Sequence, residues 1–376
     1  MKKTYIVRDK ENNLRIFNNK PHKKNDVWVV GNVLSDEIVE YGTVINEHEI
    51  LDLFKCLTFN DEPILFNPYD KKIDGVIFYV NGEDDIWKKQ YERYCKLNDN
   101  NFEINESHSK AKVIDYGVLK YLFRSIDKNA KFINNIYLVV QSDSQVPDWV
   151  NRDTVKVVLH EEFIPKEFLP TYNSFTIDMF VHKIHGISER FLVFEDDMVV
   201  TDNISENTFF NGYKTKETME DRDISKLDPS KNMMNYQKLW LRSSNLVKKE
   251  FNEEESDNLY WRTNHGVSPI IKCDMEYLTQ KYRNEIRDSI TMFRDSKNYV
   301  RWMFRYFTWK KNGMEQNGVN HGYFTFKDKS RLLEDLYNSK KYQTIVIQEF
   351  KFEDGDEHIV EKGLNRHFPN KCKYEI

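Results

Sequence analysis

The chain has 376 residues, which is long enough for one large domain or two smaller ones with buried cores. Hydrophobic residues make up 39% of it, charged residues 31%, and the net charge is −5 at pH 7. This charge argues against a nucleic-acid binder, because binding to the phosphate backbone requires clustered Lys and Arg. No apolar run approaches the roughly 20 residues that span a bilayer. The first 13 residues also lack the apolar core of a signal peptide.

The four cysteines lie far apart in the sequence, and none of them belongs to a CxxC pair. This spacing predicts free thiols in a reducing compartment rather than a disulfide framework or a zinc site. We therefore expect a cytoplasmic protein without a transmembrane segment. Peripheral association with the inner face of the membrane is left open.

The first 70 residues contain short strand-like runs and one helical pattern. Strands are predicted over 4–7 and 27–30, and a helix over 50–57. A turn-rich stretch at 66–72 follows. We predict a small N-terminal subdomain over 1–70 and a main domain over 71–376.

Strands and helices alternate from residue 76 onward. The predicted strands are 76–80, 136–140, 155–159 and 191–194, and the predicted helices are 84–96, 115–127 and 173–185. Strands joined by helical crossovers indicate an α/β fold with a mostly parallel sheet. Ligands of such sheets gather at the carboxyl ends of the strands.

Residues 201–240 are polar and show no clear period, so we predict a lid or insertion there. Helices follow at 240–251, 274–288 and 297–308, and the chain closes with a helix (329–338), a strand (344–347) and a helix (357–367). These helical additions flank the predicted sheet.

Three consecutive carboxylates, Glu195, Asp196 and Asp197, follow the predicted strand that ends at Phe194. Such close like charges repel each other, and partial burial makes each ionised form costlier. A bound cation removes both problems, so Asp196 and Asp197 predict a site for Mg²⁺ or Mn²⁺ against a diphosphate. The alternative is that these acids simply begin a solvated loop.

Asn81, Gly82 and Asp84 follow the predicted strand at 76–80. An Asn-Gly pair lets the backbone turn sharply and approach a ligand closely. By itself this motif favours an ordinary turn, with a turn that approaches a ligand as the alternative.

Four blocks of the chain, in order, resemble the Stealth family of sugar-1-phosphate transferases. They are IDGVIFYVNGEDDIW at 73–87, the region 112–200, a third block with NHGVSPII at 264–271 and FRDS at 293–296, and FPNKCKYE at 368–375. The family includes bacterial capsule and cell-surface polysaccharide phosphotransferases and the catalytic subunit of the lysosomal-enzyme N-acetylglucosamine-1-phosphotransferase. It usually has Asn-Asp-Asp where this chain has Glu195, Asp196 and Asp197.

The resemblance implies a Rossmann-like, glycosyltransferase-A-like core over 71–376. It also implies transfer of a hexose- or N-acetylhexosamine-1-phosphate from a nucleotide-sugar, such as UDP-GlcNAc, to an oligosaccharide, polysaccharide or glycolipid hydroxyl. The products would be UMP and a phosphodiester linkage in capsular or cell-surface polysaccharide. Two alternatives remain open: a metal-dependent glycosyltransferase that releases UDP, and a non-catalytic carbohydrate-binding protein.

The resemblance also implies roles for single residues. His265 is the expected general base, although an Asp could take that part, and Asp197 is catalytic through the metal. Arg294 and Arg242 are expected to clamp the phosphates, a task that suits the planar guanidinium. The remaining expected substrate-binding residues are Asn81, Gly82, Asp84, Arg124, Asn173, Ser174 and His182. Bracing of the site is the alternative for Arg124 and Asn173, and a structural role is the alternative for His182.

Overall fold

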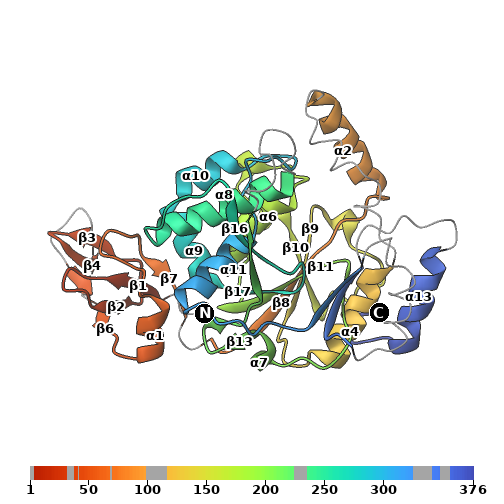
Figure 1. Ribbon diagram of the computed structural model, residues 1–376, viewed down its shortest axis with the longest axis horizontal. Helices are drawn as coiled ribbons and strands as arrows, with labels where there is room; N and C mark the ends of the chain where they lie inside the picture. Colours follow the sequence, from red (N-terminus) through yellow and green to blue (C-terminus); the bar gives the residue numbers. More distant parts are fainter. Residues whose placement is uncertain are drawn as a thin grey trace.

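The computed structural model describes residues 4–31, 38–40, 42–67, 70–98, 117–223, 235–324, 341–347 and 356–376. A five-stranded sheet in the order β10-β9-β8-β11-β17 lies at its centre (Figure 1). The strands span Val155–Leu159 (β10), Ile136–Val140 (β9), Ile73–Phe78 (β8), Arg190–Glu195 (β11) and Ser268–Ile271 (β17). The first four are parallel, and β17 runs antiparallel to β11. The predicted α/β class and mostly parallel sheet are confirmed.

The central strands are mostly apolar because helices cover the sheet, and the charged residues Asp74 of β8 and Arg190 of β11 are buried as well. Every residue of β8 and β9 is buried, and in β11 the last residue, Glu195, is the one that reaches solvent. The neighbouring helices are α4 (Val118–Asn129), α6 (Ser174–Phe180), α9 (Lys272–Lys281) and α11 (Trp302–Lys311). A run without polar alternation is the pattern expected of a strand buried on both faces.

The N-terminal region forms two small antiparallel sheets of its own, at one end of the molecule in Figure 1. One has the order β6-β2-β1-β7 and the other β3-β4-β5. The strands are β1 (Tyr5–Arg8), β2 (Leu14–Phe17), β3 (His22–Lys24), β4 (Val27–Gly31), β5 (Ile38–Glu40), β6 (Thr43–Val44) and β7 (Ile64–Leu65). The helix α1 (His48–Leu53) lies between β6 and β7 in the sequence. The region docks on the main domain where Lys311 Nζ donates to the Leu53 carbonyl at 2.8 Å.

Two of the later predicted helices have different boundaries in the structure. The single helix predicted over 274–288 is wrong: α9 ends at Lys281, and α10 (Arg283–Ser289) begins after Tyr282. Tyr282 breaks the helix because its φ and ψ, −105° and 35°, lie outside the helical region. The helix predicted over 297–308 begins only at Trp302, because Asp295 Oδ1 accepts from Lys297 N at 2.8 Å and fixes a turn there.

The helix predicted over 173–185 is also shorter. The helix α6 ends at Phe180 and continues as the 3₁₀ turn η4 (Val181–Lys183). A loop then leads to β11 and contains Gly186 at φ 76°, a conformation that suits glycine. This early end matters because a cavity lies along the segment, as described below.

The remaining elements surround the sheet. They are α2 (Asp85–Leu97), β12 (Met198–Val200), α7 (Glu206–Phe209), β13 (Phe210–Asn211), β14 (Lys214–Thr215), β15 (Met219–Asp223), α8 (Asn235–Glu250), β16 (Leu259–Thr263), β18 (His321–Phe324), β19 (Thr344–Ile347) and α13 (Asp356–His367). The strands β12, β19 and β18 form a small sheet, and α2 projects from the body (Figure 1). Residues 224–234 of the predicted lid and the helix predicted over 329–338 lie outside the described residues.

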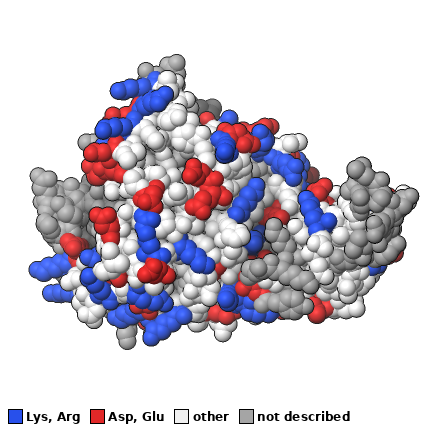
Figure 2. Space-filling model, turned by 180° about the vertical axis from the view of Figure 1, so that it is seen from behind, with Lys and Arg blue, Asp and Glu red and all other residues white. Residues whose placement is uncertain are grey.

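The surface carries both signs of charge. On the face seen in Figure 2, Lys and Arg are interspersed with Asp and Glu among the coloured residues. All four cysteines are free, as their spacing predicted. Within the described ranges, no helix has both the length and the apolar character needed to cross a bilayer.

Candidate functional site

The carboxyl ends of β8 and β11 lie side by side, because Phe78 pairs with Glu195 in the parallel register. The turn at Asn81 follows β8, and the turn at Asp196 and Asp197 follows β11. A hydrogen bond from Val80 N to Asp196 Oδ2 at 3.4 Å links the two segments. The structure thus brings together two elements that the sequence placed at strand ends.

Gln145, for which the sequence predicted no role, holds the Asn81 turn. Its buried side chain accepts from Asn81 N at 2.7 Å and donates to the Asn81 carbonyl at 3.1 Å. The Asn81 side chain accepts from Glu83 N at 3.0 Å, and Asp84 caps α2 by accepting from Trp87 N at 2.6 Å. The predicted substrate-binding residues of this turn therefore also fix its backbone, and Gly82 is buried between them.

Arg301, immediately before α11, joins two carboxylates from distant parts of the chain. It donates to Asp178 of α6 and to Glu195 at the end of β11. The Arg301 and Asp178 side chains are buried, whereas that of Glu195 is 20% exposed. One guanidinium therefore serves two carboxylates at the edge of the sheet.

The pKa values of these two acids move in opposite directions. Burial raises the pKa of Asp178, and the attraction of Arg301 only partly opposes this effect. Burial would also raise the pKa of Glu195, but nearby positive groups, Arg301 first, outweigh this effect and hold that pKa below its usual value. Glu195 is thus the ionised partner of Arg301, and its charge is balanced without a metal.

Because Glu195 is engaged by Arg301, Asp196 and Asp197 are the carboxylates of the triplet that could hold a cation. No group of three or more His, Cys, Asp or Glu side chains forms a metal cluster within the described part of the chain. Mg²⁺ usually keeps only one or two carboxylates and takes its other ligands from water and substrate phosphates. Two adjacent aspartates fit that kind of site better than an all-protein cage.

His265 lies in the loop between β16 and β17. The antiparallel pairing of Val193 with Ser268 brings the start of β17 next to the end of β11, and so places His265 at the same edge. Burial lowers the pKa of His265; the Glu195 carboxylate acts against this, while nearby arginines, among them Arg301, lower the pKa further. A neutral imidazole at neutral pH can accept a proton.

Gly266 lets the chain next to His265 pack tightly. A Cβ at this position would lie 2.9 Å from the ring of His321, so a larger residue would have to displace that ring. The ring of Tyr323, also on β18, lies edge-on to His265 with a centroid separation of 6.0 Å. The loop that carries His265 is therefore held by the small sheet of β18.

Arg294 belongs to the same edge. Its Nη2 donates to Ser174 Oγ at 3.0 Å, and its guanidinium carbon lies 5.0 Å from the centre of the Phe175 ring. Its charge acts on Glu195 and on His265. Arg294 and Ser174, both predicted from the sequence, are thus placed beside the acidic turn.

Asn173 lies under this edge and braces it. It is fully buried and caps α6 by accepting from Phe175 N at 3.1 Å, while its amide donates to Asn298 Oδ1 at 3.0 Å and to Thr291 Oγ1 at 3.1 Å. It ties α6 to the loop that carries Arg294. This is the bracing role that was one alternative for Asn173.

The other predicted site residues lie elsewhere. Arg124 binds both carboxylate oxygens of Glu375, and so holds the C-terminal segment against α4. Arg242 is exposed on α8, 4.8 Å from the centre of the Tyr299 ring, and shows no contact with the acidic turn among the described residues. His182 is buried and lines a separate cavity.

Sequence reasoning missed Asp178 and Arg301, although the sequence carried a signal for both. Asp178 stands within the apolar run FTIDMF, and Arg301 within YVRWMF. A single charge inside an apolar run must be paired when the run is buried. The sequence could not show that these two charges pair with each other.

Residues 112–218 match the sequence profile of Stealth protein conserved region 2. The capsular polysaccharide phosphotransferase CpsJ of Streptococcus thermophilus is 37% identical over 147 residues, which cover 38% of this chain and 60% of that protein. The chain therefore spans about 60% of the length of this relative.

Two other relatives match over most of their length. The capsular polysaccharide phosphotransferase WcwK of Streptococcus pneumoniae is 25% identical over 343 residues, with 81% of this chain and 98% of that protein covered. The receptor polysaccharide phosphotransferase WefC of Streptococcus oralis is 27% identical over 340 residues, with coverages of 81% and 99%.

Among solved structures, the galactosyltransferase LgtC, in complex with donor and acceptor sugar analogues, is 11% identical. The match covers 80% of this chain and 98% of that one, at a TM-score of 0.34. A likeness this slight carries no argument, so the fold assignment rests on the sheet order described above.

Proposed function

We propose that this chain, which belongs to the Stealth family, transfers a sugar 1-phosphate from a nucleotide-sugar to a hydroxyl of a carbohydrate acceptor. The observation that carries the proposal is the meeting of Asp196, Asp197, His265 and Arg294 at one edge of the sheet. The relatives named phosphotransferases of capsular and receptor polysaccharides support the same reaction.

The proposed donor is a UDP-linked hexose or N-acetylhexosamine, such as UDP-GlcNAc. The proposed acceptor is an oligosaccharide, polysaccharide or glycolipid, and the product is a phosphodiester linkage in a capsular or cell-surface polysaccharide. The reaction would take place in the cytoplasm or at the inner face of the membrane, where nucleotide-sugars are available.

Asp196 and Asp197 would hold Mg²⁺ or Mn²⁺. When bound, the ion supplies positive charge that neutralises the diphosphate of the donor. Arg301 holds the Glu195 carboxylate in a fixed position next to this turn. The Arg301 guanidinium is itself held in place, because its second amino group donates to Asp178.

His265 and Arg294 would act on the reacting groups. The acceptor hydroxyl oxygen forms a bond to the phosphorus next to the sugar, its proton passes to the neutral His265 ring, and the bond to the nucleoside monophosphate breaks. Arg294 donates hydrogen bonds to the phosphoryl oxygens, on which charge develops. Ser174 and Phe175 hold the guanidinium in place for this task.

The leaving group distinguishes this reaction from that of a metal-dependent glycosyltransferase. Attack on phosphorus releases UMP from a UDP-sugar, whereas attack on the anomeric carbon releases UDP. Chromatography of the spent reaction with a phosphatase-free preparation measures the two nucleotides. We expect UMP; a UDP peak without UMP would replace the assignment by a glycosyltransferase, and release of neither nucleotide would favour a carbohydrate-binding protein.

The same assay tests His265. His265→Ala should slow UMP release far more than it weakens donor binding, because proton transfer is needed mainly in the transition state. An equal loss of both would make His265 a binding residue rather than the general base.

A further inference from the structure

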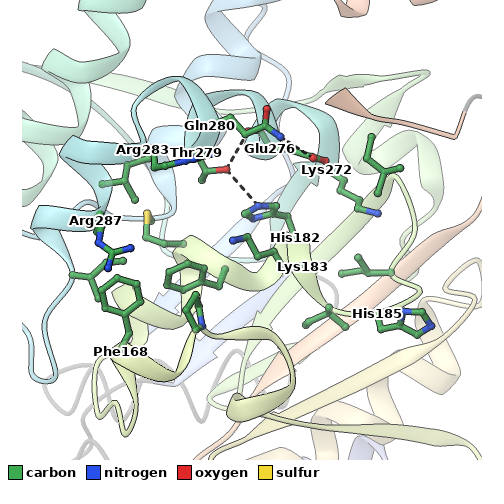
Figure 3. Close-up of a pocket in the computed structure, with 18 of the residues that line it drawn as sticks. Phe168, His182, Lys183, His185, Lys272, Glu276, Thr279, Gln280, Arg283 and Arg287 are labelled. Carbon is green, nitrogen blue, oxygen red and sulfur yellow. Dashed lines mark hydrogen bonds between the residues drawn. The ribbon is translucent and has the colours of Figure 1, made fainter. Parts of the chain in front are cut away.

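A cavity of about 760 Å³ lies between α6, the 3₁₀ turn Val181–Lys183, α9 and α10 (Figure 3). Its volume falls within the range of small-molecule sites in proteins, which runs from a few hundred to about a thousand Å³. The functional site described above does not account for it.

The cavity and the candidate active site lie on different sides of α6. Asp178 of this helix contacts Arg301 at the carboxyl edge of the sheet, whereas Met179 and Phe180 line the cavity. The lining residues 184–187 precede the first residue of β11, and Asp196 follows its last. The cavity is therefore a separate space near the amino end of β11.

Four cationic side chains border the cavity: Lys183, Lys272, Arg283 and Arg287. In Figure 3, Arg283 and Arg287 come from one end, Lys272 stands at the other, and Lys183 lies between them. Among the described residues, Lys183, Lys272 and Arg283 form no salt bridge, whereas Arg287 pairs with Glu167 at 3.3 Å. The lining also contains Glu276, so four cations face two carboxylates.

The electrostatics of the cavity favour an added negative charge. Partial desolvation lowers the pKa of Lys183; Glu276 and Glu167 oppose this effect, and the Arg283 charge strengthens it. Burial raises the pKa of Glu276, although the charges of Lys272 and Lys183 act against it. Cations held close together are stabilised by an anion between them, in the same way that close carboxylates are stabilised by a metal.

The rest of the lining is apolar. Ile184, Ile187, Ile286 and Ile290 contribute to it, and the rings of Phe168 and Phe180 stack with a centroid separation of 5.6 Å. Phe168 also supports Arg287, whose guanidinium carbon lies 5.4 Å from the ring centre. The apolar wall and the cationic rim of the cavity therefore meet at the Phe168 ring.

From the cationic rim and the apolar wall together, we infer that the cavity binds a phosphate monoester carried on an apolar chain. Inorganic phosphate would satisfy the cations but leave the partly exposed side chains of Phe168 and Ile290 in contact with water. A neutral lipid would fill the wall and desolvate the cations without pairing them. This binding site goes beyond the proposed transferase reaction and does not depend on it.

Calorimetric titration of the full chain with dihexanoyl phosphatidic acid, kept below its micelle concentration, tests the inference. Dihexanoylglycerol and inorganic phosphate serve as the two half-ligands. We expect the phosphatidic acid to bind at least about tenfold more tightly than either, because it gains both the charge pairing and the apolar contact. Equal binding of inorganic phosphate, or no binding of the phosphatidic acid, would overturn the inference.

Variants locate the binding. Arg283→Gln and Lys183→Gln replace exposed residues, and each should weaken phosphatidic acid binding about tenfold. Phe168→Ser, at the partly exposed rim, should weaken phosphatidic acid binding far more than inorganic phosphate binding. Lys238→Gln, an exposed lysine on α8, is the matched charge control and should change nothing.

Asp197→Ala separates the cavity from the donor site. Phosphatidic acid binding should persist in this variant, whether or not the proposed transferase activity is found. If Asp197→Ala abolishes phosphatidic acid binding, or if the Arg283 and Lys183 variants bind as well as the wild type, the ligand does not occupy the cavity and the inference fails.

Discussion

Arg124 and Arg301 are both buried arginines that pair with carboxylates from distant parts of the chain, yet their surroundings differ. Arg124 gives Nε and Nη2 to both oxygens of one carboxylate, Glu375, at 2.7 and 2.9 Å, and Nη1 to the Phe368 carbonyl at 2.8 Å. Arg301 divides its donors between two carboxylates, those of Asp178 and Glu195.

The two sites differ in how many carboxylates share the positive charge of the arginine. One cation meets one anion at Arg124, and the hydrogen bonds from this arginine hold the pKa of Glu375 low in spite of the burial that would raise it. At Arg301 two carboxylates share one guanidinium, and burial raises the pKa of Asp178 to about 7. The closed pair at Arg124 fixes the C-terminal segment, whereas Arg301 balances the Glu195 charge and leaves Asp178 with a raised pKa.

The largest expected effect comes from removing a carboxylate of the acidic turn, which follows Glu195 at the edge where Arg301 lies. Asp197→Ala should reduce turnover on the order of a thousandfold or more and leave the fold intact, because it removes a proposed metal ligand along with a repulsive charge. Asp196→Ala should behave in the same way. The measurements are nucleotide release with Mg²⁺ or Mn²⁺ and thermal unfolding.

Glu375→Ala is the control for the aspartate variants. It should leave turnover near normal but lower the free energy of unfolding by about 3 kcal/mol, because Arg124 then lacks its charged partner in a buried place. Near-normal turnover of either aspartate variant, or no effect of EDTA on the wild type, would contradict the metal role.

A smaller effect is expected from changing the geometry of a cation while keeping its charge. Arg294→Lys loses the planar fork, so turnover should fall on the order of a hundredfold if about 3 kcal/mol of transition-state stabilisation is lost. Arg124→Lys, the matched change, should lower stability and leave turnover alone. If Arg294→Lys has unaltered kinetics, the contact of Arg294 with Ser174 is structural only.

Much of the sheet could be predicted because its signal is local. The strand at Ile136–Val140 has the predicted boundaries, since a buried parallel strand reads as a continuous apolar run. The partly exposed edge strand Val155–Leu159 also has the predicted boundaries. The edge that carries Asp196 and Asp197 followed from the same signal, because ligands of parallel sheets gather at the carboxyl ends of the strands. Helix ends were less predictable: Tyr282 interrupts a helical pattern without a Gly or Pro to announce it.

The pairings within the site could not be predicted. The two bonds of Arg301 span 123 and 106 residues of sequence, and the clamp of Gln145 on Asn81 spans 64. Periodicity and turn signals describe neighbours along the chain, whereas these contacts depend on how the elements pack. The same limit applies to Arg124, whose sequence neighbourhood does not show that its partner is the next-to-last residue of the chain.

The smallest expected effect concerns His160, a buried group without the charged partner that Arg124 and Arg301 possess. Its Nδ1 has no hydrogen-bond partner among the described residues, and burial lowers its pKa to about 3. The unfolded chain binds a proton near pH 6.5, so the contribution of His160 to stability is complete above this pH. It is lost as the pH falls from about 6.5 towards 3.

His160→Gln removes this titration, and denaturant unfolding at two pH values measures it. Between about pH 7.5 and pH 5.5, the wild type should lose on the order of 1 kcal/mol more stability than the variant, since one pKa unit corresponds to about 1.4 kcal/mol. If His160→Gln leaves the pH dependence of the wild type unchanged, His160 takes up a proton in the folded chain as readily as in the unfolded chain, and burial without a partner does not keep it neutral.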